Sequence, residues 1–260
     1  MQPWNAAGHD AAGNGIPRPL PVAGAARALQ DIAAERPMEA APAAFVASRL
    51  AALSAAPGSG GEARRAARRG PVLWVQDRAS RRESGRLYET GLRRAFRIEG
   101  PILLVRVSHP RDALRAMEEG AACAALAAVV GEVDGSAAVL DMTATQRLAL
   151  RARVSGVPVW LLRGPSAGGL SAARLRWRLG SRPSAAHPHD PAAPGAPAWS
   201  AELVRAAGEA PGRWEIVHDG GGERTGAGPD GAPDRLGLVP LSGDRPLAPP
   251  GGAEPLAAAG

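Results

Sequence analysis

The stretch PILLVRVSHPRDALRAMEEGAACAALAAVV, residues 101–130, decides the fold class, because it predicts a strand, a helix and a second strand in succession. The apolar run Ile102–Val107 predicts the first strand. Asp112 is expected to cap a helix that ends at Gly120, since glycine readily adopts the left-handed conformation of a C-cap. Leu126–Val130 predicts the second strand. A helix between two buried strands favours parallel pairing, with the helix on one face of the sheet.

The same alternation continues on both sides of this unit. Ala173–Leu179 alternates strictly between polar and apolar residues, which favours an edge strand or an antiparallel strand. The whole pattern predicts an α/β core with a mostly parallel sheet flanked by helices. Further strands are predicted at Val72–Val75 and Val157–Leu162, and further helices at Ala25–Glu35, Pro42–Ala55, Arg86–Phe96 and from Asp141 or Thr143 to about Val154, closed near Gly156.

Composition shifts along the chain predict one folded core between disordered tails. The core is expected at 25–182, after a disordered lead at 1–24 that is rich in Gly, Pro and Ala. A linker is expected at 183–195 and a small C-terminal β-hairpin within 196–218, followed by a mostly disordered tail at 219–260.

The residue counts exclude several classes of chemistry. Cys123 is the single cysteine, so the chain has no internal disulfide and no multi-cysteine metal site. There is no lysine, and all 31 basic residues are arginine, so no reaction that requires a lysine amine is available. No segment has the pattern of a signal peptide or the roughly 20 apolar residues of a membrane span, and we therefore expect a cytoplasmic protein without membrane contact.

Positive charge is concentrated in one region. Met142–His189 has no Asp or Glu and carries eight arginines, more than the net charge of +6 of the whole chain. In a strand, Arg174, Arg176 and Arg178 would share one face, and Arg147 and Arg151 lie one helical turn apart. These five arginines are candidates for binding single-stranded DNA. An acidic protein partner and an inert solvated surface are the alternatives.

Three further features are weaker candidates for a site. Glu132 follows a predicted parallel strand at its carboxyl end, where α/β proteins place ligands, although a structural hydrogen bond would also explain it. Trp199 and Trp214 flank the predicted hairpin and either bind a partner or pack in the core. The segment APGSGG at 56–61 has the glycines of a phosphate loop but is followed by glutamate and alanine instead of Lys and Ser/Thr, which indicates a turn. The histidines form no convincing metal site.

Several segments, in order, resemble the ImuA family of bacterial RecA-like proteins. These segments are PVLWVQDR at 71–78, YETGL at 88–92, AMEEG at 116–120, LAAVVGEV at 126–133, LDMTATQRLAL at 140–150, SGVPVWLLR at 155–163 and GAPAWSAELVRAAGEAPGRWEI at 195–216. Together they cover somewhat more than half of the chain, and their order and spacing make the resemblance fairly specific.

The resemblance implies a RecA-type core and a role in SOS-induced translesion DNA synthesis. It also implies an ImuB-like protein and an error-prone DNA polymerase subunit as partners, and RecA is a further candidate. The parts that hydrolyse ATP are missing from this chain. The segment Arg36–Ala43, in place of a phosphate loop, has neither Gly nor Lys; Arg78 aligns with a catalytic glutamate and Gly131 with a metal-binding aspartate.

The sequence therefore predicts a non-enzymatic accessory factor with a degenerate RecA-like core, no cofactor and no metal. Two alternatives remain open. One is a SulA-like regulator of cell division, and the other is an active RecA-like ATPase with an unconventional nucleotide site. Direct DNA binding would distinguish the accessory factor from the first alternative, and nucleotide turnover would support the second.

Overall fold

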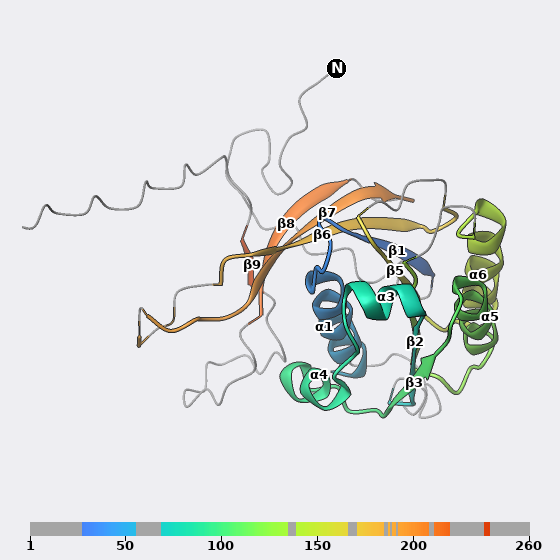
Figure 1. The fold of residues 1–260 in the computed structure, drawn as a ribbon, viewed down its shortest axis with the longest axis horizontal. Coiled ribbons are helices and arrows are strands. Elements are labelled where there is room, and N and C mark those ends of the chain that lie inside the picture. The colour runs from blue at the N-terminus through green and yellow to red at the C-terminus, as the bar shows by residue number, and fades with distance from the viewer. Residues whose placement is uncertain are drawn as a thin grey trace, which may run out of the picture.

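The computed structural model describes residues 28–55, 69–134, 139–165, 171–184, 187, 189–190, 192–207, 211–218 and the backbone of 237–239 (Figure 1). The helices are α1 (Ala41–Ala55), α3 (Arg78–Glu83), α4 (Glu89–Phe96), α5 (Pro110–Ala121) and α6 (Met142–Ser155). The strands are β1 (Leu29–Ala34), β2 (Val72–Gln76), β3 (Ile102–Arg106), β4 (Ala128–Glu132), β5 (Val159–Arg163), β6 (Leu175–Arg182), β7 (Ala198–Ala206), β8 (Gly212–Val217) and β9 (Gly237–Val239).

The nine strands that the structure describes belong to one sheet, in the order β3-β2-β4-β5-β1-β6-β7-β8-β9. The pairs from β3 to β6 are parallel, and β7, β8 and β9 add antiparallel pairs at one side. The predicted α/β core with a mostly parallel sheet and a C-terminal hairpin is therefore confirmed. The hairpin continues the same sheet, because β7 pairs along its length with β6.

The direction of each crossover decides which face a helix covers. The chain moves from β1 to β2 and then to β3 in one direction along the sheet, and from β3 to β4 and β5 in the other. Because parallel crossovers are right-handed, the two directions place helices on opposite faces. Accordingly α1 and α4 share one apolar core with the sheet, and α5 and α6 share another (Figure 1).

The expected helix at Ala25–Glu35 is wrong, because the described part of this segment is the central strand β1. Its alanines favour a helix in isolation. In the folded chain, β1 pairs with β5 on one edge and with β6 on the other, and these two ladders override the local preference.

The ends of α5 also differ from the prediction. His109, and not Asp112, is the N-cap residue, and Pro110 takes the first helical position, where its missing N–H costs nothing. Gly120 lies inside the helix and not at a left-handed C-cap. A Cβ at Gly120 would clash with the side chain of Leu73, so this glycine lets α5 approach β2 closely.

Elsewhere the local predictions are mostly confirmed. Asp141 caps α6 by accepting a hydrogen bond from Ala144 N at 2.7 Å, and Gly156 ends that helix with φ of 76°. The helix expected at Arg86–Phe96 begins later, at Glu89, and the short helix α3 before it was not predicted. Strand β6 is neither an edge strand nor purely antiparallel, because it lies between β1, to which it is parallel, and β7. The APGSGG segment lies outside the described residues.

Candidate functional site

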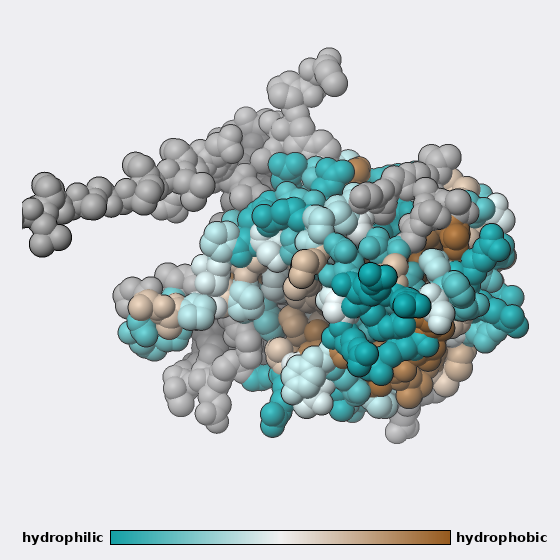
Figure 2. Space-filling view, viewed as in Figure 1, coloured by the Kyte–Doolittle hydropathy of each residue, from teal (hydrophilic) through white to brown (hydrophobic). Residues whose placement is uncertain are grey.

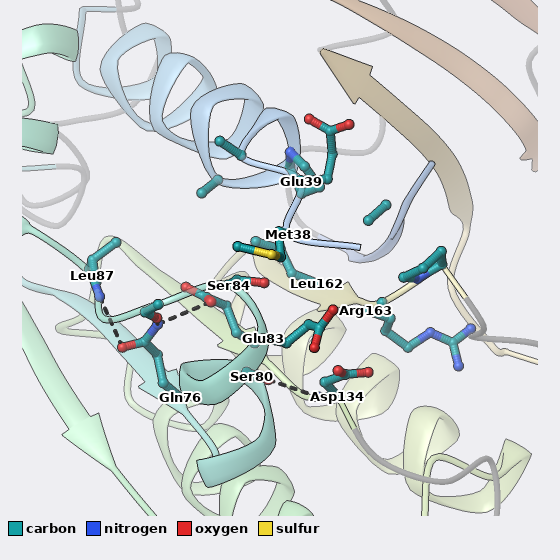
Figure 3. A pocket seen from close by; sticks show the side chains of 18 of the residues that line it. Met38, Glu39, Gln76, Ser80, Glu83, Ser84, Leu87, Asp134, Leu162 and Arg163 are labelled. Carbon is teal, nitrogen blue, oxygen red and sulfur yellow. Dashed lines mark hydrogen bonds between the residues drawn. The ribbon is translucent and has the colours of Figure 1, made fainter. Parts of the chain in front are cut away.

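A cavity of about 170 Å³ opens at the carboxyl ends of β1, β2, β4 and β5 (Figure 3). Parallel sheets bind ligands at this edge, where successive crossovers leave on opposite faces. One wall of the cavity is α3, over which strongly hydrophilic residues gather in Figure 2. The charged and polar residues of the lining are Arg36, Glu39, Gln76, Ser80, Glu83, Ser84, Arg86, Tyr88, Glu132, Asp134 and Arg163.

Glu132 is buried beside this cavity, and both of its carboxylate oxygens accept hydrogen bonds. Trp74 Nε1 donates to Oε1 at 2.5 Å, and Gln76 Nε2 donates to Oε2 at 3.0 Å. Burial raises the pKa of Glu132, and the two hydrogen bonds only partly oppose this effect. The contacts match the structural alternative for Glu132, since they join β2 to β4 beneath the cavity.

Gln76 connects Glu132 to the segment between α3 and α4. Its Oε1 accepts a hydrogen bond from Leu87 N at 3.2 Å, and its Nε2 also donates to Gly85 O at 3.3 Å (Figure 3). Gln76 is 1% exposed, so its amide has no access to bulk water. The wall of the cavity at 85–87 is thus fixed to the sheet by one buried side chain.

The two residues that the family resemblance would align with catalytic groups of RecA are not part of the cavity lining. Gly131 lies against α5, and a Cβ at this position would clash with Met117. Glu132, one position later, is the β4 residue that lines the cavity. Arg78 is exposed at the first position of α3 and is not part of the lining. Close packing of α5 therefore accounts for the glycine at 131.

Acidic side chains at the cavity do not fit a bound nucleotide. Glu39, Glu83, Glu132 and Asp134 all contribute to the lining. Burial, together with the negative charges of Glu83 and Asp77, raises the pKa of Asp134. A triphosphate placed among these carboxylates would be repelled.

Of the three arginines in the lining, Arg86 is exposed and the other two are already paired with acids. Arg163 is already held by Asp31 in a buried ion pair of 2.8 Å, and Arg36 lies 3.8 Å from Glu39. The loop between β1 and α1 has no glycine or lysine with which to hold a phosphate. We conclude that the residues present do not fit the nucleotide that a RecA-like fold implies.

A second candidate site is the face of β6 that carries Arg176 and Arg178, with Arg174 immediately before the strand. The alternate residues Leu175, Trp177 and Leu179 are buried in the core on the α1 side of the sheet, so Arg176 and Arg178 lie on the opposite face, and Arg174 directly precedes the strand. No described helix covers this face of β6, which explains the strict alternation of the sequence.

The three arginines differ in how far they are neutralised. Within the described residues, Arg174 is exposed and has no acidic partner. Arg176 is 25% exposed and lies 3.7 Å from the buried carboxylate of Asp31. Arg178 is 57% exposed and lies 3.9 Å from Glu202 of β7, which also pairs with Arg213 of β8 at 3.1 Å. The face is positive, but Glu202 lowers its charge at the centre.

The helical candidates lie on a separate element. Arg147 and Arg151 are exposed on α6. Arg147 Nε donates to Glu118 Oε1 of α5 at 2.9 Å, so it helps to hold the two helices together. The structure therefore does not join all five candidate arginines into one unpaired surface.

The rings of Trp199 and Trp214 are 2% and 3% exposed and belong to the core on the α1 side of the sheet. Trp214 packs on Trp177, with ring centroids 5.8 Å apart. This is the core alternative, and the prediction that these rings contact a partner is corrected: neither ring is accessible in the folded chain.

Metal ligands do not converge within the described ranges, where no group of three or more His, Cys, Asp or Glu is suitably placed. His187 Nδ1 instead accepts hydrogen bonds from the backbone N–H groups of His189 and Asp190 at 3.3 and 3.0 Å. Among the helices that the structure describes, none combines the length and apolar character required to cross a membrane.

The sequence analysis missed Asp31, Arg163 and Glu39 as residues that organise the site. A signal existed for two of them: Asp31 interrupts the apolar segment LQDIAA, and Arg163 directly follows the apolar run of β5. A buried charge in such a run indicates an ion pair. Nothing in the sequence indicates that Glu39 folds back to the N-terminus of its own helix.

Comparison with known proteins identifies relatives that match about two thirds of the chain. No family model matches the sequence. Two proteins named "Protein ImuA", from the NA1000 / CB15N and CB 15 strains of Caulobacter vibrioides, are each 32% identical to it over 185 residues. Each match covers 67% of this chain and 67% of the relative. The chain therefore belongs to the ImuA family.

Proposed function

We propose that this protein is a non-catalytic accessory factor of an error-prone translesion synthesis assembly in the bacterial SOS response. Membership of the ImuA family supports a role in the SOS mutagenesis system. One structural observation carries the non-catalytic part of the proposal. The loop before α1, where a RecA-like ATPase would hold phosphate, has no Gly or Lys and places the Glu39 carboxylate at the start of the helix.

The proposed task is to hold polymerase partners close to DNA or to RecA. The partners are an ImuB-like protein and an error-prone polymerase subunit. The proposed DNA contact is the β6 face of Arg176 and Arg178, together with Arg174 immediately before the strand. Exposed arginines of this kind bind phosphates without reading the sequence, and such binding weakens as the salt concentration rises.

The proposed docking surface for ImuB is the exposed side of the β7–β8 hairpin, not its tryptophans. Val204 of β7 is 46% exposed there, whereas the two tryptophan rings are buried. An exposed valine is only a small contact, so polar residues of the hairpin would have to contribute most of the surface.

Two measurements test the proposal. Purified protein should release phosphate from ATP only at background rate, with or without single-stranded DNA. Turnover of about 0.1 per second or faster that Glu132→Ala abolishes would overturn the non-catalytic assignment, since typical enzymes turn over at about 1 per second or faster. Wild-type protein that binds no labelled oligonucleotide at low salt would limit DNA contact to the partners.

A further inference from the structure

The N-terminus of α1 is the part of the cavity that most resembles an anion-binding site. The first N–H groups of a helix have no partner within the helix, and the helix dipole adds partial positive charge there. Phosphates and carboxylates bind at such positions. In this chain Ala41 N, at the first position of α1, donates a hydrogen bond to Glu39 Oε1 at 3.3 Å.

Three residues contact the Glu39 carboxylate: Ala41, Ser181 and Arg36. Besides the backbone of Ala41, the hydroxyl of Ser181 at the end of β6 donates to the same oxygen, and Arg36 Nε lies 3.8 Å from the other. The side chain of Glu39 is only 4% exposed. Burial by itself would raise the pKa of Glu39, but these hydrogen bonds and the charge of Arg36 outweigh it and lower the pKa. The carboxylate is therefore held as an anion.

The loop that contains Glu39 is also attached to β6 by other contacts. Glu35 N donates to Leu179 O at 2.7 Å, and Arg36 Nη2 donates to Ser181 O at 3.1 Å. Arg182 Nη1 donates to Glu35 Oε2 at 3.0 Å. The Glu35 carboxylate lies directly against Gly180, where a Cβ would displace it. These contacts attach the 35–39 loop to β6.

We propose that Glu39 is a built-in anion that takes the place of a phosphate at the N-terminus of α1 and keeps this site closed to nucleotides. Figure 3 shows Glu39 beside the end of α1, with Asp134 at the opposite side of the cavity. In this proposal the Glu39 carboxylate holds the loop in the conformation that a bound nucleotide would otherwise impose. This inference rests on the proposed function. The loop is attached to β6, and β6 is the strand with the proposed DNA-binding face.

An ordinary helix cap would make some of the same contacts, so the test asks whether a diffusible anion can replace the carboxylate. Glu39→Ala removes the carboxylate but leaves Ala41 N and the Ser181 hydroxyl in place. We expect its thermal midpoint to fall by about 2–4 °C. Inorganic phosphate should then raise the midpoint of this variant saturably, measured against sodium chloride at the same ionic strength.

Two controls make the result specific to this site. Glu119→Ala removes an exposed, ion-paired glutamate of α5 and should show no saturable response to phosphate. Adding Ser181→Ala to Glu39→Ala should weaken the phosphate response, because the variant then lacks the hydroxyl donor. If Glu39→Ala does not fold, Glu39→Ser takes its place, since the serine hydroxyl can still accept a hydrogen bond and the shorter side chain leaves room for an anion.

The outcomes divide clearly. A saturable phosphate response in the Glu39 variant and not in wild type supports the proposal. An equal response in both proteins, or no response in a folded Glu39 variant, overturns it. The proposed function is judged separately, by phosphate release and DNA binding of the wild type. If the site is closed to nucleotides, ATP with Mg²⁺ should leave the affinity of the wild-type protein for single-stranded DNA unchanged. A change in that affinity would contradict the closure.

Discussion

The carboxylate of Asp31 accepts two hydrogen bonds from the guanidinium of Arg163, at 2.9 Å from Nε and 2.8 Å from Nη2, and each side chain is 1% exposed. Arg176 Nε lies 3.7 Å from the same carboxylate. Asp31 is on β1, the strand between β5 and β6, and these two arginines belong to its neighbours. One buried carboxylate therefore bridges the centre of the parallel sheet to the strand that carries the arginine face.

Asp31→Asn should destabilise the fold strongly, because it leaves the buried guanidinium of Arg163 without its counter-charge. The expected loss in free energy of unfolding is about 3–5 kcal/mol, measured by urea denaturation. Replacing both partners, as Asp31→Leu with Arg163→Met, should cost less than the single change, since no buried charge is then unpaired. A double variant that is less stable than Asp31→Asn would contradict this account.

Arg174→Gln with Arg178→Gln should reduce salt-dependent binding to single-stranded DNA while preserving the fold, because both side chains are exposed. Each phosphate contact contributes about −0.7 to the log–log salt slope, so the slope should fall in magnitude by about 1.4. Adding Arg176→Gln should bring the reduction to about 2. Fluorescence anisotropy with a labelled oligonucleotide at several salt concentrations measures the slope.

The matched control for this experiment is Arg82→Gln with Arg94→Gln, which removes the same charge from exposed arginines of α3 and α4. The control should retain a steeper slope than the β6 variant. Equal slopes in the two variants would show that only net charge matters and would assign the β6 face to a protein partner or to solvent.

Glu202→Gln should strengthen DNA binding. Glu202 pairs with Arg178 at 3.9 Å and with Arg213 at 3.1 Å, so removing its charge releases two arginines towards the same open face. The salt slope should become steeper in the anisotropy assay. Glu119→Gln, which frees Arg115 on α5, is the comparison. A Glu202 variant that binds no more tightly than this comparison would argue against a DNA contact at β6.

Trp214→Ala should destabilise the core by about 3–5 kcal/mol, because the ring is 3% exposed and packs on Trp177. Urea denaturation measures the loss. Deleting 196–260 should for the same reason abolish cooperative unfolding, since it removes β7 and β8 and uncovers Trp177. Val204→Ala, at an exposed position of the same hairpin, should change stability by less than about 0.5 kcal/mol. A stable, cooperative truncated protein would show that the hairpin is an independent unit.

Glu132→Gln should change how stability depends on pH. Burial raises the pKa of Glu132 in the folded state, so the folded protein binds a proton at this carboxyl more tightly than the unfolded chain does. The resulting stabilisation of the fold is fully present below the unfolded pKa of about 4.5. This contribution is lost as the pH rises through the folded pKa. Relative to wild type, Glu132→Gln should therefore gain stability as the pH rises above about 4.5. A difference in free energy of unfolding that stays constant across this range would contradict the raised pKa.

Sequence patterns correctly predicted the strands and helix ends whose signals lie within a few neighbouring residues. The apolar runs of β2, β3, β4 and β5 predicted their strands, and Asp141 and Gly156 marked the ends of α6 by their capping chemistry. The alternation along 173–179 assigned the three arginines to one face before any partner strand was known. Where two signals competed, the prediction failed: the alanines near β1 favoured a helix that the sheet does not permit.

The sequence by itself determined the α/β class, the family resemblance, the absence of a lysine-bearing phosphate loop and the position of the positive charge. Only the tertiary structure decided which of those charges are neutralised. Asp31 and Arg163 lie 132 positions apart, and Glu39 and Ser181 lie 142 apart. Such pairs depend on strand order, and strand order is set by how crossovers pack on both faces of the sheet. The local periodicity of the sequence does not encode that packing. The buried Asp31–Arg163 ion pair and the contact of Glu39 with the N-terminus of α1 therefore could not be predicted from it.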